Sequence, residues 1–272
     1  MRIARDLPTL RAEVARLGRL ALVPTMGALH EGHLSLLAAA RREGEAVAAS
    51  IFVNPLQFGP QEDFARYPRD EAGDLAKLER AGCDLVWMPS VEVMYPPGRA
   101  TTIEVGGPAE GWEGEARPGH FRGVATVCAK LFLQTGAAVA VFGEKDWQQL
   151  QVIRRMVTDL DLPVRIVGCP TVREADGLAL SSRNRFLSAE ERARAPALHA
   201  VLRRVAGELA AGALVEAALA AARTDLAAQG FAVDYLALVA PETLRPAATL
   251  PGRLIAAARL GSVRLLDNIA AP

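Results

Sequence analysis

Two histidines in a glycine-containing segment are the first candidates for chemistry in this sequence. His30 and His33 lie on either side of Gly32, and the segment follows a short apolar run that ends at Val23. A helix that begins at this glycine would present backbone N–H groups to an anion, and imidazole N–H groups would donate to charge developing on a phosphoryl group. The alternative is a pair of histidines that only cap the helix. Because two of the four histidines in the chain lie here, we favour phosphate chemistry.

Cationic and hydroxyl side chains in two later segments have the properties of a polyphosphate site. Lys145 follows the apolar run 138–142, and Arg183 lies further along the chain. Lysine supplies a movable point charge, whereas the arginine fork binds two phosphate oxygens at once. Ser181 and Ser182 add hydroxyl donors beside the arginine. An isolated arginine in a polar loop would be a solvated surface residue, but these companions favour a phosphate site.

Amide and carboxylate side chains indicate where other ligands bind. Gln57 and Gln149 follow two different apolar runs, and an amide both donates to and accepts from hydroxyl and carboxylate groups. They suit a hydroxylated acid, although either glutamine alone would be an ordinary loop residue. Asp74 is expected to place Mg²⁺ through water, and the alternative, a solvated carboxylate in the first turn of a helix, is equally open. Segment 117–123 is either a phosphate-side loop or a structural turn.

The elements expected to position these residues alternate between apolar strands and amphipathic helices. Uniformly apolar runs predict strands covered by helices on both faces, as in a parallel sheet, over 20–23, 47–53, 84–88, 138–142 and 164–167. Helices are expected between them, for example over 34–43 and 72–81. The pattern predicts an α/β fold with a doubly wound parallel sheet. In such a sheet ligands bind beyond the carboxyl ends of the strands, which is where the residues named above occur.

The sequence after residue 173 changes character and predicts a second domain. Ser188 to Glu191 has the spacing of a capping box, and helices rich in Ala, Leu and Arg are expected near 189–211 and 213–229. Strands are expected over 231–239, 254–259 and 263–266, with a hairpin turn at Gly261-Ser262. We therefore expect a nucleotide-binding domain over 1–173 and a smaller α+β domain over 174–272.

Composition argues against several other classes of protein. The 272 residues include 31 basic and 31 acidic side chains, whereas a nucleic-acid-binding protein usually carries a basic excess. No uncharged apolar run approaches the ~18 residues of a membrane span, and the N-terminus lacks the apolar core of a signal peptide. The three cysteines have no metal-ligand spacing, which favours buried thiols in a reducing compartment. We expect a cytoplasmic protein without nucleic-acid or membrane partners.

Several segments, taken together, resemble the bacterial pantothenate synthetase family over essentially the whole chain. They are residues 24–33, 52–59, 67–69, 117–126, 142–149, 170–174 and 176–184. The first segment alone would fit the wider nucleotidyltransferase superfamily, which includes class I aminoacyl-tRNA synthetases, whereas the joint set in this order is specific. The resemblance implies a Rossmann-like N-terminal domain, a smaller C-terminal lid domain and a homodimer.

The resemblance also implies a reaction and its site residues. In that reaction (R)-pantoate is adenylated by ATP in the presence of Mg²⁺, pyrophosphate leaves, and β-alanine then displaces AMP to give pantothenate, a precursor of coenzyme A. His33 is the expected catalytic histidine, acting with His30, Lys145 and Arg183. The expected ATP-binding residues are Met26, Gly27, Ala28, Leu29, His30, Glu31, Gly32, His33, Gly143, Glu144, Lys145, Asp146, Val172, Leu180, Ser181, Ser182 and Arg183. The residues expected to bind pantoate or β-alanine are Gln57, Gln149 and Asn54.

Two rival functions and a few departures from the family pattern accompany this prediction. One rival is a nucleotidyltransferase or acyl-adenylating synthetase with another acceptor such as tRNA, against which the balanced charge and the lack of an anticodon-type module argue. The other is a non-catalytic nucleotide sensor, whose signature would be a missing His33, Lys145 or Arg183. Leu133, Ala137 and Ala138 stand where the family usually has Asn and Pro-Asp, and Leu180 stands where Met is common. We interpret these exchanges as structural variation, with a role of the 133–138 region in dimer contacts left open.

Overall fold

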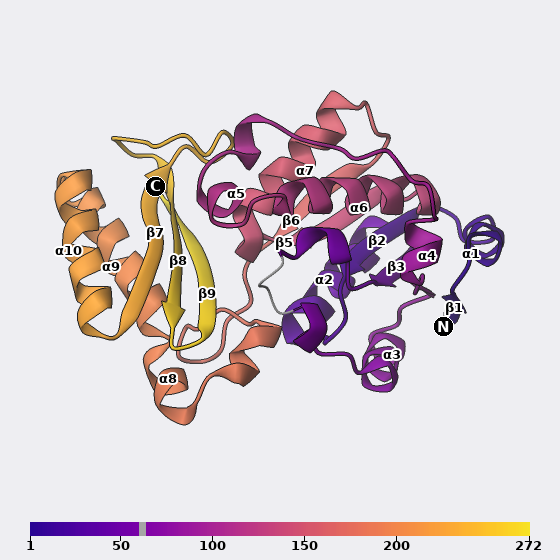
Figure 1. The fold of residues 1–272 in the computed structure, drawn as a ribbon, viewed down its shortest axis with the longest axis horizontal. Helices are drawn as coiled ribbons and strands as arrows, with labels where there is room; N and C mark the ends of the chain where they lie inside the picture. The colour runs from indigo at the N-terminus through magenta and orange to yellow at the C-terminus, as the bar shows by residue number, and fades with distance from the viewer. Residues whose placement is uncertain (60–63) are drawn as a thin grey trace. The chain divides into compact units, whose positions relative to one another are not determined.

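The computed structural model describes residues 1–59 and 64–272 (Figure 1). These residues form two compact units, each with its own sheet. One unit comprises Met1–Glu144 with Gln149–Pro170, and the other comprises Lys145–Gln148 with Thr171–Pro272. The short segment 145–148 therefore belongs to the same unit as the C-terminal part of the chain.

The first unit contains a six-stranded parallel sheet with the order β1-β4-β3-β2-β5-β6. Its strands are β1 (Arg2–Ala4), β2 (Leu20–Thr25), β3 (Ala46–Ile51), β4 (Leu85–Trp87), β5 (Val139–Gly143) and β6 (Arg165–Cys169). From β2 the chain proceeds to β3 and β4 on one side, whereas β5 and β6 lie on the other. The strand order thus reverses between β2 and β5, which is where a doubly wound sheet binds its ligands. The predicted fold class is confirmed.

The helices of the first unit cover this sheet. They are α1 (Leu7–Val14), α2 (Glu31–Glu43), α3 (Glu71–Arg80), α4 (Val91–Met94), α5 (Trp112–Ala116), α6 (His120–Thr135) and α7 (Trp147–Asp159), of which α7 has its first two residues in the other unit. Leu36 and Leu37 of α2 pack in one core with Val23, Val47 and Val141 of the strands. Most residues of α6 are buried. The apolar runs form strands because both faces of the sheet are covered in this way.

The first unit contains one strand, β1, that the sequence did not predict, and it also contains the positions that depart from the family pattern. The edge strand β1 was not predicted, because its three residues, two of them exposed, are too few for a periodic signal. The departures from the family pattern lie at the end of α6 and just before β5. Leu133 is 71% exposed and Ala137 is 3% exposed.

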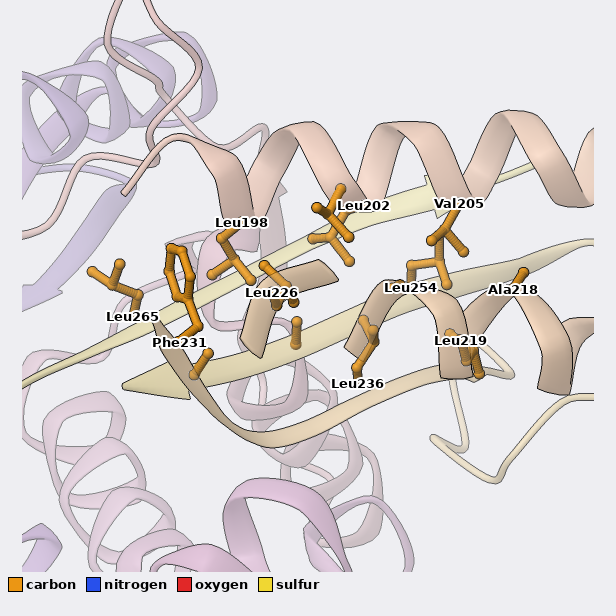
Figure 2. Close-up of a cluster of buried hydrophobic side chains, with 14 of the residues drawn as sticks. Leu198, Leu202, Val205, Ala218, Leu219, Leu226, Phe231, Leu236, Leu254 and Leu265 are labelled. Atoms are coloured by element: carbon orange, nitrogen blue, oxygen red, sulfur yellow. The ribbon is translucent and has the colours of Figure 1, made fainter. Parts of the chain in front are cut away.

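The second unit consists of a three-stranded antiparallel sheet and three helices. The strands are β7 (Phe231–Val239), β8 (Gly252–Leu260) and β9 (Val263–Ala271), in the order β7-β8-β9. The helices are α8 (Ala189–Arg194), α9 (Ala197–Ala210) and α10 (Val215–Ala228). Figure 2 shows Leu198, Leu202 and Val205 of α9 in one apolar cluster with side chains of α10 and the sheet. The predicted α+β character and the hairpin turn at Gly261-Ser262 are confirmed, because Leu260 pairs with Val263.

The helix predicted over 189–211 is wrong in one respect: it is two helices, α8 and α9. Pro196 lies between them and is the N-cap of α9. Proline has no N–H to donate, and its ring clashes with the preceding turn, so the helix must stop and restart there. The capping box at the start of α8 is present, because the Ser188 side chain accepts from Glu191 N–H and the Glu191 side chain accepts from Ser188 N–H.

The three cysteines are free thiols, and the predicted burial is confirmed for two of them. Cys83 and Cys128 are buried, and Cys169 is half-buried. Burial raises the pKa of the Cys83 thiol to about 11 and that of Cys128 to about 12. Both therefore stay protonated at neutral pH and behave as small apolar residues.

Candidate active site

The N-terminus of α2 is capped by the two histidines that the sequence singles out. The helix begins at Glu31, one residue earlier than the predicted start at Gly32, and His30 is its N-cap. Gly32 N–H donates to Nδ1 of His30 (3.2 Å), and His30 N–H donates to Nδ1 of His33 (3.3 Å). The two ring centroids are 4.2 Å apart. The side chains thus satisfy backbone N–H groups that a helix start leaves without intrahelical partners.

This capping arrangement fixes which ring nitrogen carries the proton. Since Nδ1 of His30 and Nδ1 of His33 both accept hydrogen bonds from backbone N–H groups, the neutral rings carry their protons on Nε2. Each ring then presents Nε2–H as its donor, the group that a phosphoryl oxygen requires. The capping interpretation and the phosphate interpretation are therefore compatible, because they use different nitrogens.

The connection from β2 to α2 is held by a buried carboxylate of α3. Asp74 is 1% exposed, and its two oxygens accept hydrogen bonds from Ala28 N–H (2.7 Å) and Leu29 N–H (2.8 Å). Gly27 has φ +83° and Ala28 has φ +52°, so the loop adopts a left-handed conformation here. A Cβ at Gly27 would lie 2.9 Å from Asp74 Oδ2. This position therefore needs glycine both for its conformation and for its close approach to the carboxylate.

The burial of Asp74 bears on both expectations for this residue, a solvated carboxylate and a carboxylate that places Mg²⁺ through water. The carboxylate is not solvated, although it lies in the first turn of α3. Its burial and its two backbone hydrogen bonds favour a structural role over the expected placement of Mg²⁺ through water. Across residues 1–59 and 64–272, no cluster of three or more His, Cys, Asp or Glu side chains is arranged to hold a metal ion.

Three of the expected ligand-binding residues come together where β2 and β3 end. Gln57 is 9% exposed and lies in a short 3₁₀ turn, Pro55–Gln57, after β3. Its Nε2 donates to Met26 Sδ (3.1 Å), and its Oε1 accepts from Asn54 Nδ2 (3.0 Å). Met26 follows β2, which pairs with β3 along its length. The structure thus joins Met26, Asn54 and Gln57 as their place after neighbouring parallel strands predicts.

Asn54 is fully buried and uses the whole hydrogen-bonding capacity of its amide. Besides Gln57, its Nδ2 donates to Gly123 O (3.1 Å), and its Oδ1 accepts from Tyr95 Oη (2.8 Å) and Leu56 N–H (3.3 Å). Burial raises the pKa of Tyr95, so its hydroxyl remains a donor. Two donors and two acceptors are the limit of an asparagine side chain. This geometry favours a role for Asn54 in orienting Gln57 rather than in contacting a substrate.

Segment 117–123 holds the main chain of Gln57. The Gln57 carbonyl accepts from Nδ1 of His120 (2.9 Å) and from Nη2 of Arg117 (3.2 Å). Arg117 Nη1 lies 3.0 Å from His120 Nε2, and because arginine only donates, the ring proton of His120 is on Nδ1. A Cβ at Gly123 would lie 2.2 Å from the carbonyl oxygen of Leu56, so α6 approaches this turn closely. The geometry supports the structural-turn interpretation of this segment.

The remaining site residues of the first unit lie at the ends of strands β2 and β5. Gln149 is half-buried in the first turn of α7, after Gly143 and Glu144 at the end of β5. β5 is hydrogen-bonded to β2, so these residues follow the strand next to the one that leads to α2. The expected ATP-binding residues of this unit are Met26, Gly27, Ala28, Leu29, His30, Glu31, Gly32, His33, Gly143 and Glu144.

The other expected ATP-binding residues lie in the second unit. They are Lys145, Asp146, Val172, Leu180, Ser181, Ser182 and Arg183. Leu180 N–H donates to Val172 O (3.0 Å), which places these two residues side by side. Ser181 caps a 3₁₀ turn, Ser182–Phe186, and its hydroxyl accepts from Arg183 N–H (3.3 Å). Lys145 Nζ lies 3.7 Å from Asp146 Oδ1.

Sequence reasoning missed two polar residues of β9. Asp267 is 3% exposed and accepts from both Nη atoms of Arg173 (2.7 and 2.8 Å). Burial raises the pKa of Asp267, but the contacts with His199 and Arg173 lower it by more, so the net pKa lies below its usual value. Asn268 donates through Nδ2 to Lys145 O (2.8 Å). An Asp-Asn pair inside a largely apolar strand sequence was the signal that could have revealed them.

Comparisons with known proteins give one consistent result. A family model described as pantoate-beta-alanine ligase matches residues 2–270. The pantothenate synthetase of Acidiphilium cryptum (strain JF-5) is 61% identical over 278 residues, covering 99% of this chain and 100% of the relative. That of Granulibacter bethesdensis is 59% identical, covering 99% and 96%.

Solved structures agree with these relatives. Pantothenate synthetase from Thermus thermophilus has a TM-score of 0.95 at 53% identity, covering 100% of this chain and 99% of that chain. Pantoate-beta-alanine ligase from Francisella tularensis, solved in complex with beta-gamma ATP and beta-alanine, has a TM-score of 0.86 at 33% identity, covering 100% and 98%. Among the described residues, no helix combines the length and apolar character needed to cross a membrane.

Proposed function

Since this chain belongs to the pantoate–β-alanine ligase family, we infer that it condenses pantoate with β-alanine in an ATP-dependent reaction of pantothenate biosynthesis. The observation that carries this function in the structure is the capped N-terminus of α2. There His30 and His33 both use Nδ1 for the cap and therefore carry Nε2–H donors. Backbone N–H groups at a helix N-terminus and preorganised imidazole donors together suit the charge of a phosphoryl group.

The first chemical step is the adenylation of (R)-pantoate. A carboxylate oxygen of pantoate attacks the α-phosphorus of ATP, a new O–P bond forms, the bond to the β-phosphate oxygen breaks, and pyrophosphate leaves. His30 and His33 donate to the oxygens on which charge develops. Lys145 and Arg183 supply positive charge to the polyphosphate, the first as a point charge and the second as a two-toothed donor.

The second step transfers the acyl group to β-alanine. The neutral amine attacks the carboxyl carbon of pantoyl adenylate, the C–N bond forms, the C–O bond to phosphate breaks, and AMP leaves while the nitrogen releases a proton. A mixed anhydride is sensitive to water, so we propose that a C-terminal lid domain over 174–272 closes during the reaction and that residues 1–173 form the nucleotide- and pantoate-binding domain.

Gln57 and Gln149 are the proposed pantoate-binding pair. Gln57 donates to the sulfur of Met26, which is a weak acceptor. A hydroxyl or carboxylate oxygen of pantoate would be a stronger acceptor for the same N–H group. Asn54, His120 and Arg117 hold the side chain and the main chain of Gln57 in place. The binding energy of pantoate is then not spent on ordering this residue.

We propose Mg²⁺ as a companion of ATP, whose phosphate oxygens would carry the ion into the site. The expectations of a cytoplasmic homodimer without nucleic-acid partners remain predictions from the sequence and the resemblance. Light scattering coupled to size-exclusion chromatography measures the oligomeric state directly.

The test of the function is an AMP-release assay in which ATP, Mg²⁺, pantoate and β-alanine are omitted in turn. We expect AMP release to require all four. Labelled pyrophosphate should exchange into ATP with pantoate alone, because the adenylate forms before β-alanine reacts. Exchange that requires β-alanine contradicts the free adenylate. AMP release with another acceptor, or nucleotide binding without turnover, favours the rival synthetase or the nucleotide sensor.

A further inference from the structure

Strand β9 contains a polar pair, Asp267 and Asn268, that the reaction described above does not use. The two side chains are 3% and 4% exposed and lie in a largely apolar strand of the second unit. Burying polar groups is unfavourable unless their hydrogen bonds are made, so the partners of such a pair indicate what it does.

Asn268 connects β9 to the main chain of Lys145. Its Nδ2 donates to the Lys145 carbonyl oxygen at 2.8 Å, and its Oδ1 accepts from Arg253 Nε of β8 at 2.7 Å. The Nδ2 and Oδ1 atoms of the Asn268 amide therefore contact different parts of the second unit. One contacts the segment that contains Lys145, and the other contacts an arginine of the neighbouring strand.

That arginine contacts the same segment two residues later. The guanidinium carbon of Arg253 lies 3.4 Å from the centroid of the Trp147 ring, which is a cation–π contact. Trp147 Nε1 also donates to Pro241 O at 2.7 Å. Segment 145–148 is thus held within the second unit at Lys145, which Asn268 contacts directly, and at Trp147, which Asn268 reaches only through Arg253.

Asp267 fixes Asn268 from the other side. Asn268 N–H donates to Asp267 Oδ1 (2.7 Å), and Asp267 in turn binds both Nη atoms of Arg173. Arg173 Nη2 also lies 3.4 Å from Asn268 O. Charge-assisted bidentate pairs of this kind are roughly twice as strong as neutral contacts and have a specific geometry. The amide that contacts Lys145 is therefore held on a fixed support.

We propose that Asn268 is a positioning residue for ATP, which acts by fixing the main chain of Lys145. The inference rests on the proposed function, in which Lys145 binds the polyphosphate. A lysine ammonium is a point charge on a flexible four-carbon stem, so its placement depends on how well its backbone is fixed. Within the second unit, Asn268 provides that fixation through the Lys145 carbonyl.

The primary test is Asn268→Asp, followed by pyrophosphate exchange in the presence of pantoate. This nearly isosteric change keeps an acceptor for Arg253 but removes the donor to Lys145 and sets an oxygen against its carbonyl. We expect the KM for ATP to rise roughly tenfold or more, since a small displacement of a positioned group is costly, whereas the KM for pantoate should stay within about twofold. Arg264→Gln is the matched control. It removes a hydrogen bond from the same strand to Asp234 of β7 and should leave both constants unchanged.

Two further variants separate positioning from a general loss of structure. Trp147→Phe keeps an aromatic ring under Arg253 but removes the donor to Pro241, so it should raise the KM for ATP in the same direction. Adding Asn268→Asp to Lys145→Gln should have little further effect, because both changes act through one ammonium. Thermal denaturation of each variant checks that the fold is retained, and Asn268→Ala, which also removes the donor to Lys145, carries the test if Asn268→Asp does not fold.

The outcomes distinguish this inference from the function on which it rests. If Lys145→Gln raises the KM for ATP but Asn268→Asp and Trp147→Phe do not, the positioning role is wrong and the function stands. The same conclusion follows if the double variant shows fully additive losses, or if the KM values for ATP and pantoate rise together. If Lys145→Gln itself leaves ATP use unchanged, the assignment of Lys145 is wrong, and the inference falls with it.

Discussion

At the scale of single residues, the two histidines of α2 show that one side chain can be both structural and chemical. A capping histidine accepts through Nδ1, and that hydrogen bond sets the tautomer that places a donor proton on Nε2. The choice between a cap and a phosphate ligand, in which the sequence favours the phosphate ligand, is therefore not a choice between exclusive roles. The roles are separable by mutation because they use different atoms.

Two substitutions of His33 separate these roles. His33→Asn keeps an oxygen near the position of Nδ1 and so keeps the capping-box hydrogen bond from His30 N–H, whereas His33→Ala removes both that hydrogen bond and the Nε2–H donor. We expect both variants to slow adenylation by ~10² or more, the loss that follows removal of one preorganised donor. Only His33→Ala should lose about 0.5–2 kcal/mol of stability. Pyrophosphate exchange and thermal denaturation measure the two effects, and near-normal exchange by His33→Asn would return His33 to a capping role alone.

The glutamines make a prediction about substrate choice. A site built to pair with a hydroxyl rejects an analogue that lacks it, because its own polar groups are left unpaired. We expect Gln149→Ala to weaken pantoate use with ATP binding nearly intact, and to reduce discrimination against a pantoate analogue lacking one hydroxyl. Gln57→Ala should weaken pantoate use and also raise the β-alanine requirement. Initial rates against each substrate test this, and a loss confined to ATP binding contradicts the assignment.

At the scale of elements, the ends of β2 and β3 are positioned by side chains from distant helices. Asp74 of α3 holds the β2–α2 connection, and His120 of α6 holds the turn after β3. Neither residue needs to touch a substrate in order to affect the reaction. Substitutions at this scale displace a reacting group without removing it. They are therefore expected to change one kinetic constant or the stability of the protein.

Asp74→Asn is expected to destabilise the loop while leaving the magnesium dependence of the rate unchanged. The asparagine amide keeps an oxygen that can accept from one of the two backbone N–H groups, but its NH₂ group faces the other N–H group. This loss costs about 1–3 kcal/mol in a buried site. Adenylation should slow because the start of α2 loses its support. Urea denaturation and rates at varied Mg²⁺ with fixed ATP check both parts. A selective shift in the Mg²⁺ requirement would instead indicate that Asp74 contributes to metal binding.

His120→Ala should affect pantoate rather than ATP. It removes a donor to the Gln57 carbonyl, so the glutamine side chain becomes less well oriented, and we expect roughly tenfold poorer pantoate use by analogy with other small misplacements. His120→Asn, which offers an amide donor near the position of Nδ1, should recover part of the loss. A change in the KM for ATP alone would show that segment 117–123 acts on the phosphates, the alternative that the sequence leaves open.

At the scale of the whole molecule, the chain divides into two units, and each unit has its own apolar core. The second unit also contains an ion pair between the half-buried Arg173 and the buried Asp267. Such a pair makes the stability of its unit depend on pH, whereas apolar packing does not. Its contribution can therefore be isolated by titration.

The Asp267 carboxylate should contribute stability that acid removes. Because its folded-state pKa lies below its usual value, its contribution is fully present above the unfolded-state pKa of about 3.9 and is lost as pH falls through the lower folded-state pKa. Asp267→Asn should therefore be less stable than wild type at pH 7, and the difference should shrink below pH ~4. Denaturant titrations of both proteins at several pH values measure this, and a difference that stays constant with pH contradicts it.

Sequence alone determined the parts of this protein that depend on local pattern. Apolar runs predicted strands β2 to β9, because a period or a continuous run of apolar residues reports burial directly. Residue types at the ends of strands identified the loops around His30, Gln57, Lys145 and Arg183, and spacing identified the capping box at Ser188. The resemblance to the family rests on the same residues, and the comparisons with known proteins agree with that family.

Only the tertiary structure decided which polar residue partners which. No local pattern indicates that the Asp74 carboxylate is buried against two backbone N–H groups, that His120 holds the Gln57 carbonyl, or that Asn268 contacts Lys145. These partners are 45, 63 and 123 positions apart in the chain. A hydrogen bond depends on distances of about 3 Å between atoms that only folding brings together, and no local period records them. Local pattern therefore set the elements, while packing set the geometry of the site.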